Sequence, residues 1–185
     1  MKTIICIIGT IGSGKDTAAE YISKKLSIPT IAISQQLKDF AIERGLEPTR
    51  DNLIKMNNVF SKEKGPLFVT KTLLGKIPED FIIITGIRML EIIEYMRKEH
   101  KLVLLAVTAE PKIRFERCIA RGKLGEAKTF EEFIENEQRE NSAPNVQRLF
   151  ECMKLADYTI SNESDVGDFF KQVDEFLKLK GLGKK

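Results

Sequence analysis

The residues best suited to chemistry lie near the start of the chain, in the run Gly9-Thr10-Ile11-Gly12-Ser13-Gly14-Lys15-Asp16-Thr17. The spacing Gly-x4-Gly-Lys is typical of a loop whose backbone N–H groups surround phosphate groups. The lysine after the second glycine can reach the outer phosphates of a nucleotide. The run therefore predicts a nucleotide-binding loop, and each of its residues is a candidate contact of the nucleotide.

The segments on either side of this loop support the prediction. The apolar run Ile4–Ile8 precedes it and indicates a buried strand, and Ala18–Ile22 follows it and opens an amphipathic helix. A strand, a glycine-rich turn and a helix N-terminus form the structural context that a phosphate-binding loop requires. The alternative, a glycine-rich turn that contains a lysine by chance, does not account for this order of elements.

The residue after the lysine is the candidate metal ligand. Loops of this kind usually carry Ser or Thr there, whose hydroxyl contacts Mg²⁺, whereas this chain has Asp16 and then Thr17. A carboxylate is a suitable hard oxygen ligand for Mg²⁺. The sequence predicts Mg²⁺ as a cofactor and leaves open which of the two residues faces it.

The elements that must position this loop follow an alternating pattern. Short apolar, β-branched runs predict strands at Thr3–Ile8, Thr30–Ile33, Phe81–Thr85, Leu102–Val107 and Tyr158–Ile160, with charged segments of helical length between them. Such alternation predicts an α/β domain with a parallel sheet covered on both faces. Because ligands bind at the carboxyl ends of such strands, the residues after each strand are the next candidates.

Candidates for binding a second, phosphorylated molecule follow the second strand. Ser34 is expected to cap the next helix, Lys38 lies one turn further, and Arg50 falls in the first turn of a helix capped by Thr49. A cation in a first turn opposes the helix dipole, which favours an anionic ligand for Arg50. The alternatives are that Ser34 is only a cap and that both cations are only solvated. Residues 34–78 are assigned as the acceptor-binding helical region.

Further candidates follow the third strand, in Gly86-Ile87-Arg88. Gly86 permits close approach of a ligand to the backbone, and Arg88 can grip a phosphate with two parallel hydrogen bonds. The alternative for Arg88 is a salt bridge to Glu91 or Glu94 on the following helix.

A pair of helices near residues 114–140 predicts a lid. Arg114, Arg117 and Arg121 are spaced i, i+3 and i+7, so they are expected to share one helix face. The first helix is expected to end at Gly122, and Thr129 to cap the second. The alternative is a helical hairpin with a charged surface.

The composition excludes several classes of protein. The 185 residues predict a single domain, and the chain has no apolar run of transmembrane length, so no membrane partner is expected. A net charge of +3 makes nucleic acid an unlikely partner, and the sequence identifies no protein partner. Three cysteines without metal spacing indicate core thiols of a reducing compartment, so a soluble, cytoplasmic protein is expected.

Taken together, the motifs resemble those of P-loop kinases of small molecules, namely nucleoside monophosphate kinases, dephospho-CoA kinases and uncharacterised archaeal relatives of both. The motifs are the Gly-x4-Gly-Lys-x-Thr loop, Ser34-x-x-Leu37-Lys38, Gly86-x-Arg88, Arg114-x-x-Arg117 with Arg121, and Ala156-Asp157-Tyr158-x-Ile160-x-Asn162. The resemblance spans residues 3–178. It implies a three-layer fold with a five-stranded parallel sheet in the order 2-3-1-4-5, helices on both faces and a small helical lid.

The resemblance also implies roles for individual residues. Lys15 and the loop backbone would hold the phosphates of ATP, while Lys38 and Arg88 would face the acceptor phosphate. Arg117 and Arg121 would contact the transferring phosphoryl group as lid arginines. Asn162 would approach the adenine.

The expected function is ATP-dependent phosphoryl transfer to a small nucleotide-like acceptor: a nucleoside or deoxynucleoside monophosphate, or dephospho-CoA. One departure from the family keeps an alternative open. Many nucleotide kinases carry Asp at the end of the third strand, where this chain has Thr85. The alternative is a nucleotide-binding switch or assembly factor with slow ATPase activity.

Overall fold

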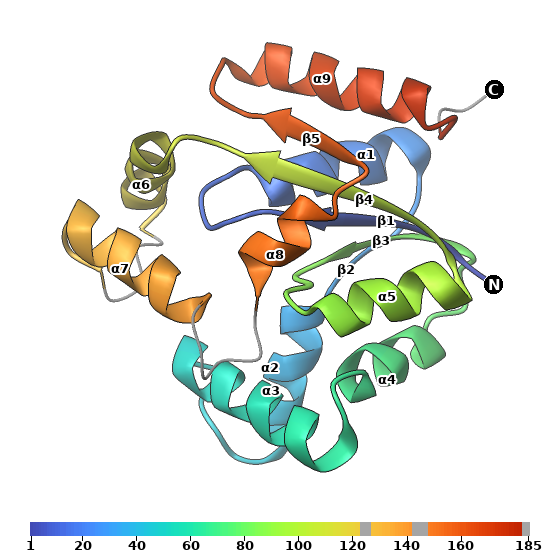
Figure 1. The fold of residues 1–185 in the computed structure, drawn as a ribbon, viewed down its shortest axis with the longest axis vertical. Helices are drawn as coiled ribbons and strands as arrows, with labels where there is room; N and C mark the ends of the chain where they lie inside the picture. The colour runs from blue at the N-terminus through green and yellow to red at the C-terminus, as the bar shows by residue number, and fades with distance from the viewer. Residues whose placement is uncertain (123–126, 142–147, 183–185) are drawn as a thin grey trace.

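Five parallel strands form the central sheet of the computed structural model, which describes residues 1–122, 127–141 and 148–182 (Figure 1). The strands lie in the order β2-β3-β1-β4-β5, which confirms the predicted order. They are β1 (Thr3–Ile8), β2 (Thr30–Ala32), β3 (Phe81–Thr85), β4 (Lys101–Thr108) and β5 (Tyr158–Ser161). Because β1 pairs with β3 on one side and β4 on the other, the loop that follows β1 leaves the middle of the sheet.

The continuous apolar runs of the strands are explained by burial on both faces of the sheet. In β1, Ile4, Cys6 and Ile8 belong to one hydrophobic core, and Ile5 and Ile7 belong to the other. All five side chains are at most 1% exposed. This two-sided burial is typical of parallel strands covered by helices.

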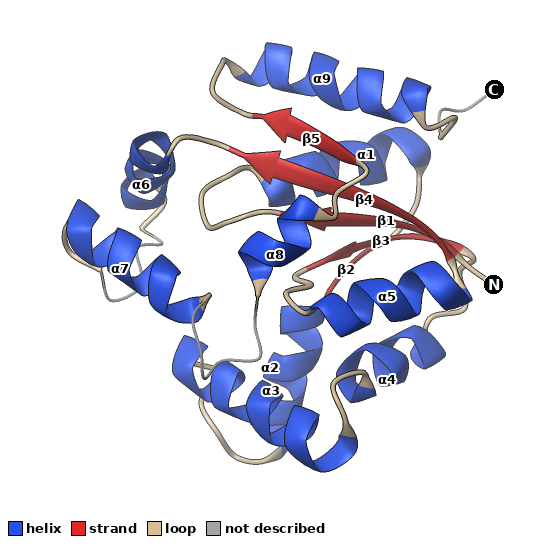
Figure 2. Cartoon of the chain, in the orientation of Figure 1, coloured by secondary structure: helices blue, strands red, loops and turns tan. Residues whose placement is uncertain are grey.

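Helices cover both faces of the sheet (Figure 2). On one face lie α1 (Lys15–Leu26) and α9 (Val166–Leu179). On the other lie α2 (Ile33–Glu43), α3 (Arg50–Lys64), α4 (Phe68–Lys76), α5 (Leu90–Glu99) and α8 (Leu149–Lys154). Two further helices, α6 (Pro111–Ala120) and α7 (Phe130–Glu140), stand beyond the end of β4, to the left in Figure 2.

Several helix limits follow from local sequence. The hydroxyl of Thr49 accepts from the N–H of Asn52 and caps α3, as predicted. Thr129 and Glu132 form a reciprocal capping box at the start of α7, where the cap was also predicted. Gly122 follows the end of α6 with φ of 60°, in agreement with the predicted stop.

The expected end of the second strand is wrong by one residue. β2 ends at Ala32, and Ile33 already belongs to α2, so Ala32 rather than Ser34 is the N-cap residue. The physical reason is that Ile33, only 5% exposed, packs into the core as the first residue of the helix. Ser34 therefore lies in the first turn of α2, where it is exposed.

Two further observations concern the lengths of the helices and the burial of the cysteines. No helix among the described residues is both long enough and apolar enough to span a membrane. Cys6, Cys118 and Cys152 are buried in the core, as predicted, and burial raises the pKa of the Cys152 thiol to about 12. Burial also raises the pKa of the Cys6 thiol, so Cys6 and Cys152 are protonated parts of the core at neutral pH.

Candidate functional site

The loop between β1 and α1 has the backbone of an anion-binding turn. Gly12 and Gly14 have φ of 78° and 100°, a left-handed region that side chains other than glycine rarely occupy. Gly14 is the N-cap residue of α1 and offers no side chain to the first N–H groups of that helix. These N–H groups need a partner from elsewhere, and an anion at the helix N-terminus supplies one.

Asn162 supports this loop from behind. Its side-chain amide donates a 2.8 Å hydrogen bond to the carbonyl of Ser13, and its own N–H donates to the carbonyl of Thr108. A Cβ atom at Gly14 would lie 2.2 Å from the amide nitrogen of Asn162, so the loop and Asn162 are in close contact. The structure thus places Asn162 against the loop, and its expected approach to adenine stays a prediction.

Lys15 and Asp16 form an ion pair at the start of α1. The Nζ atom of Lys15 lies 3.3 Å from the Oδ2 atom of Asp16, and the two side chains are 18% and 76% exposed. An ion pair as exposed as this contributes little to stability, so phosphate groups can displace it at low cost. The lysine is thereby available at the mouth of the loop.

The residues present fit a nucleotide with Mg²⁺ at this position. The loop supplies N–H groups and Lys15, and the hydroxyl of Ser13 is buried without a hydrogen-bond partner among the described residues. No cluster of three or more His, Cys, Asp or Glu residues suited to a metal exists in the described part of the chain. A magnesium ion would therefore rely on phosphate oxygens, with Asp16 or Thr17 as the protein ligand.

A cavity of about 240 Å³ opens beside the loop and brings many of the predicted residues together. Its lining includes five of them: Lys15, Asp16, Ser34, Gly86 and Arg88. They come from the loop, the start of α2 and the segment after β3. They meet because the carboxyl ends of β1, β2 and β3 lie at one edge of the sheet.

Other lining residues were missed by sequence reasoning. Leu37 of α2 and Leu53 and Ile54 of α3 form an apolar part of the same cavity, next to Ala32 and Ile33. Apolar residues on amphipathic helices are normally assigned to the core, and the only signal was that Leu37 lies one turn after Ser34. The cavity therefore joins a charged side to an apolar side.

Two predicted acceptor residues are not part of this lining. Lys38 is half-buried on α2, one turn beyond Ser34, and does not line the cavity. Arg50 is the first residue of α3, and its side chain lies outside the described part of the structure. Thr85 does line the cavity, at the end of β3, and is 5% exposed.

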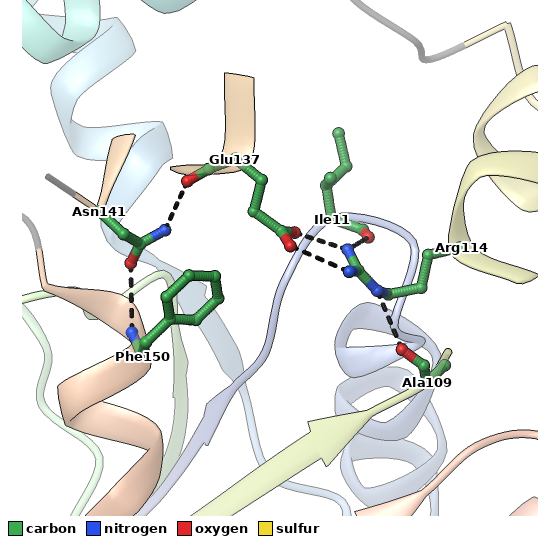
Figure 3. A network of polar contacts seen from close by, with 6 residues as sticks. All are labelled: Ile11, Ala109, Arg114, Glu137, Asn141 and Phe150. Atoms are coloured by element: carbon green, nitrogen blue, oxygen red, sulfur yellow. Dashed lines mark hydrogen bonds and ion pairs between the residues drawn. The ribbon is translucent and has the colours of Figure 1, made fainter. Parts of the chain in front are cut away.

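The three arginines that were expected to share one face of α6 differ in burial. Arg114 is buried, Arg117 is half-buried, and Arg121 is exposed at the C-cap position. The physical reason is that Arg114 turns inward and pairs with Glu137 of α7, at 2.5 and 2.9 Å (Figure 3). The Nη2 atom of Arg117 lies 3.5 Å from the Oδ1 atom of Asn162, so Arg117 reaches the back of the loop.

A second, larger hollow is lined by none of the predicted site residues. It has a volume of about 770 Å³, lies open between α4 and α5, and is lined by Leu67, Lys71, Glu91, Glu94, Tyr95, Lys98 and Glu99. Its side chains carry charges of both signs, and it includes no residue of the loop. The smaller cavity beside Lys15 is therefore the candidate site.

Comparison with known proteins identifies a family model and relatives that match most of this chain. A family model described as an AAA domain matches residues 5–142. A UPF0200 protein from Hyperthermus butylicus is 31% identical over 186 residues, covering 98% of this chain and 97% of the relative. A UPF0200 protein from Methanocaldococcus jannaschii is also 31% identical, covering 95% and 89%.

Solved structures with the same architecture are mostly kinases by name. Shikimate kinase from Bacteroides thetaiotaomicron superposes with a TM-score of 0.62 at 18% identity, over 97% of this chain and 99% of that one. A gluconokinase from Sinorhizobium meliloti gives 0.58 at 11% identity, over 97% and 93%. TT1252 from Thermus thermophilus gives 0.63 at 19% identity, over 96% and 97%. At these identities the likeness establishes the fold, which is that of P-loop kinases.

Proposed function

This chain belongs to the UPF0200 family and has an AAA domain over most of its length, and from that premise we propose that it is an ATP- and Mg²⁺-dependent kinase of a small phosphorylated, nucleotide-like acceptor. One observation carries the proposal. Lys15 of the glycine-rich loop and Arg88 after β3 line the same cavity, so two cationic side chains suited to phosphate groups adjoin. A kinase must bring together two such groups, the phosphates of its donor and those of its acceptor.

The chemistry requires positioning and charge neutralisation more than it requires a nucleophile from the protein. ATP supplies the transferable phosphoryl group, and Mg²⁺ offsets part of its charge. Lys15 and the loop N–H groups hold the phosphates, and Arg88 holds the acceptor with the bidentate geometry of a guanidinium. Arg117 and Arg121 are proposed to contact the transferring group as lid arginines, and the α6–α7 pair is proposed to limit the access of water, a competing acceptor.

The apolar side of the cavity supports an acceptor with an apolar or aromatic part. Leu37, Leu53 and Ile54 would pack against a nucleobase, whereas hydroxyl groups placed there would lose their hydrogen bonds to water. Polyhydroxylated acids, which the names of the structural neighbours suggest, therefore fit less well than nucleotides. Nucleoside and deoxynucleoside monophosphates and dephospho-CoA are the acceptors to examine first.

The test is a panel assay with purified protein. ATP and Mg²⁺ are incubated with each nucleoside monophosphate, each deoxynucleoside monophosphate, dephospho-CoA, shikimate and gluconate, and ADP release is followed. We expect acceptor-dependent ADP with a nucleotide-like acceptor, and none with Lys15→Ala. A rate equal to the acceptor-free blank across the panel would contradict the proposal.

Thr85 favours a second candidate, a nucleotide-dependent switch or assembly factor with slow ATPase activity. Its buried hydroxyl stands where many nucleotide kinases carry a carboxylate near Mg²⁺. This candidate predicts slow ATP hydrolysis without an acceptor, and a protein partner retained on an affinity column in only one nucleotide state. Retention that is the same with ATP, with ADP and without nucleotide would remove its basis.

A further inference from the structure

Arg114 connects the nucleotide loop to both outlying helices. The Nη1 atom of its guanidinium donates to the carbonyl of Ile11 at 3.2 Å, and its Nε atom donates to the carbonyl of Ala109 at 3.0 Å. Both terminal nitrogens bind the carboxylate of Glu137 on α7 (Figure 3). One side chain, 3% exposed, thus joins the loop, the end of β4 and α7.

The side chain of Ile11 makes the same connection by packing. It lies against a small hydrophobic cluster formed by Cys118, Ala127 and Phe133, which is separate from the two cores of the sheet. A phosphate-binding loop needs only the backbone at this position, so an apolar side chain that is partly buried against α6 and α7 requires another explanation. Its packing fixes the loop to the α6–α7 pair.

Gly12 allows the approach of α6 to the loop. A Cβ atom at this residue would lie 2.6 Å from the carbonyl oxygen of Arg114 and 3.0 Å from its Cα atom. The glycine therefore serves contact with α6 as well as the left-handed turn of the loop.

The contact extends along α7 to α8. The side-chain amide of Asn141 donates to the carbonyl of Glu137 at 2.8 Å, and its Oδ1 atom accepts from the N–H of Phe150 in α8 at 3.1 Å (Figure 3). Hydrogen bonds therefore run from the nucleotide loop through Arg114 and Glu137 to the start of α8.

We propose that Arg114 and Glu137 are a positioning pair that couples the shape of the nucleotide loop to the position of α7. Glu137 orients the guanidinium so that it holds the carbonyl of Ile11 outward, which leaves the loop N–H groups pointing inward toward the phosphates. Neither residue contacts the reacting groups. The inference rests on the proposed function, because it assumes that the loop binds a nucleotide.

A merely structural ion pair makes a different prediction. Replacing both members of a buried pair with apolar residues of similar volume is often neutral for stability, whereas removing one member leaves an uncompensated charge. A positioning pair must also obey reciprocity: if α7 affects nucleotide affinity, the nucleotide must affect α7 to the same extent. The pair is therefore tested by nucleotide affinity and by the response of α7, not by stability.

The experiment compares wild type with Glu137→Gln and with the double variant Arg114→Met/Glu137→Leu, in the absence of any acceptor. Calorimetry gives the Kd for ATP with Mg²⁺, and hydrogen exchange gives the protection of α7 amides with and without nucleotide. We expect the Kd to rise at least about fivefold in both variants. We also expect nucleotide to protect α7 in wild type and to lose that effect in the double variant, which should fold normally even if Glu137→Gln does not.

Arg97→Met is the matched control. Arg97 pairs with Asp157 at 2.9 Å and binds the carbonyl of Leu155, and it lies at the end of α5, at the edge of the sheet opposite the loop. This variant should leave the Kd for ATP unchanged. A folded double variant with wild-type affinity and a wild-type response of α7 would overturn the positioning role alone. Absence of nucleotide binding by wild type would overturn the proposed function, and this inference with it.

Discussion

The amide nitrogen of Asn162 lies 2.8 Å from the carbonyl oxygen of Ser13, so the residue after the last strand holds the loop that follows the first strand. Their separation of 149 residues in sequence shows that the loop has its shape partly from a distant part of the chain. Asn162→Ala would leave that carbonyl buried without its partner. We expect a loss of about 1–3 kcal/mol in the free energy of unfolding.

The same variant should also bind nucleotide more weakly, because the loop loses its support. Thermal unfolding with and without ATP and Mg²⁺ measures both effects. Asn136→Ala is a suitable control, because this half-buried asparagine accepts a solvent-exposed hydrogen bond from Arg139 within α7. An unchanged melting temperature and an unchanged ATP-induced shift for Asn162→Ala would show that the contact has no such role.

Gly14→Ala tests the close contact from the other side. The new Cβ atom would meet the amide of Asn162 at 2.2 Å, and a φ of 100° is unfavourable for alanine. The conformational strain alone should cost about 1–3 kcal/mol. The double variant Gly14→Ala/Asn162→Gly should recover the steric part of the loss and retain the conformational part.

Chemical denaturation of the two single variants and the double variant measures the coupling between these positions. Additive losses in unfolding free energy would mean that Gly14 and Asn162 do not interact, contrary to the structure.

Arg88→Ala should separate acceptor binding from ATP binding. A charge-assisted contact to a bound anion contributes about 1.5–3 kcal/mol, so kcat/KM for the acceptor should fall at least about tenfold. Arg88→Lys should recover only part of this, because an ammonium group cannot make the bidentate contact. The ATP-induced thermal shift should stay near its wild-type size.

The measurement is the KM for the acceptor together with the melting temperature of each variant. Normal kinetics with a lowered melting temperature would assign Arg88 to a structural contact with the following helix. That outcome would contradict the proposed acceptor site and leave only the proposed ATP binding.

The position of the glycine-rich loop and of the cavity beside it could be predicted because the signals for both are local. Gly-x4-Gly-Lys occupies seven consecutive residues, and Ser34 and Arg88 were selected because they follow strands. Parallel strands bring such residues to one edge of the sheet whatever the details of packing. This is why Lys15, Ser34 and Arg88 line one cavity.

The parts that could not be predicted depend on which surfaces meet. Helical spacing placed Arg114 with Arg117 and Arg121, but it could not show that the carboxylate of Glu137, 23 residues later, would draw Arg114 inward. The capping role of Ser34 failed for a similar reason. Burial of Ile33 decided where the helix begins, and a local capping preference is too weak to override core packing.

Transfer of labelled phosphate from [γ-³²P]ATP tests the central claim most directly. Wild type and Lys15→Ala are incubated with Mg²⁺ and the panel of nucleotide-like acceptors, and the products are separated and counted. The account predicts label in an acceptor product with wild type and no label above background with Lys15→Ala. ATP near a hundred times its Kd should stabilise wild type by about 2.7 kcal/mol and the variant by much less. Equal transfer of label by the two proteins, or label released from wild type only as inorganic phosphate, would contradict the account.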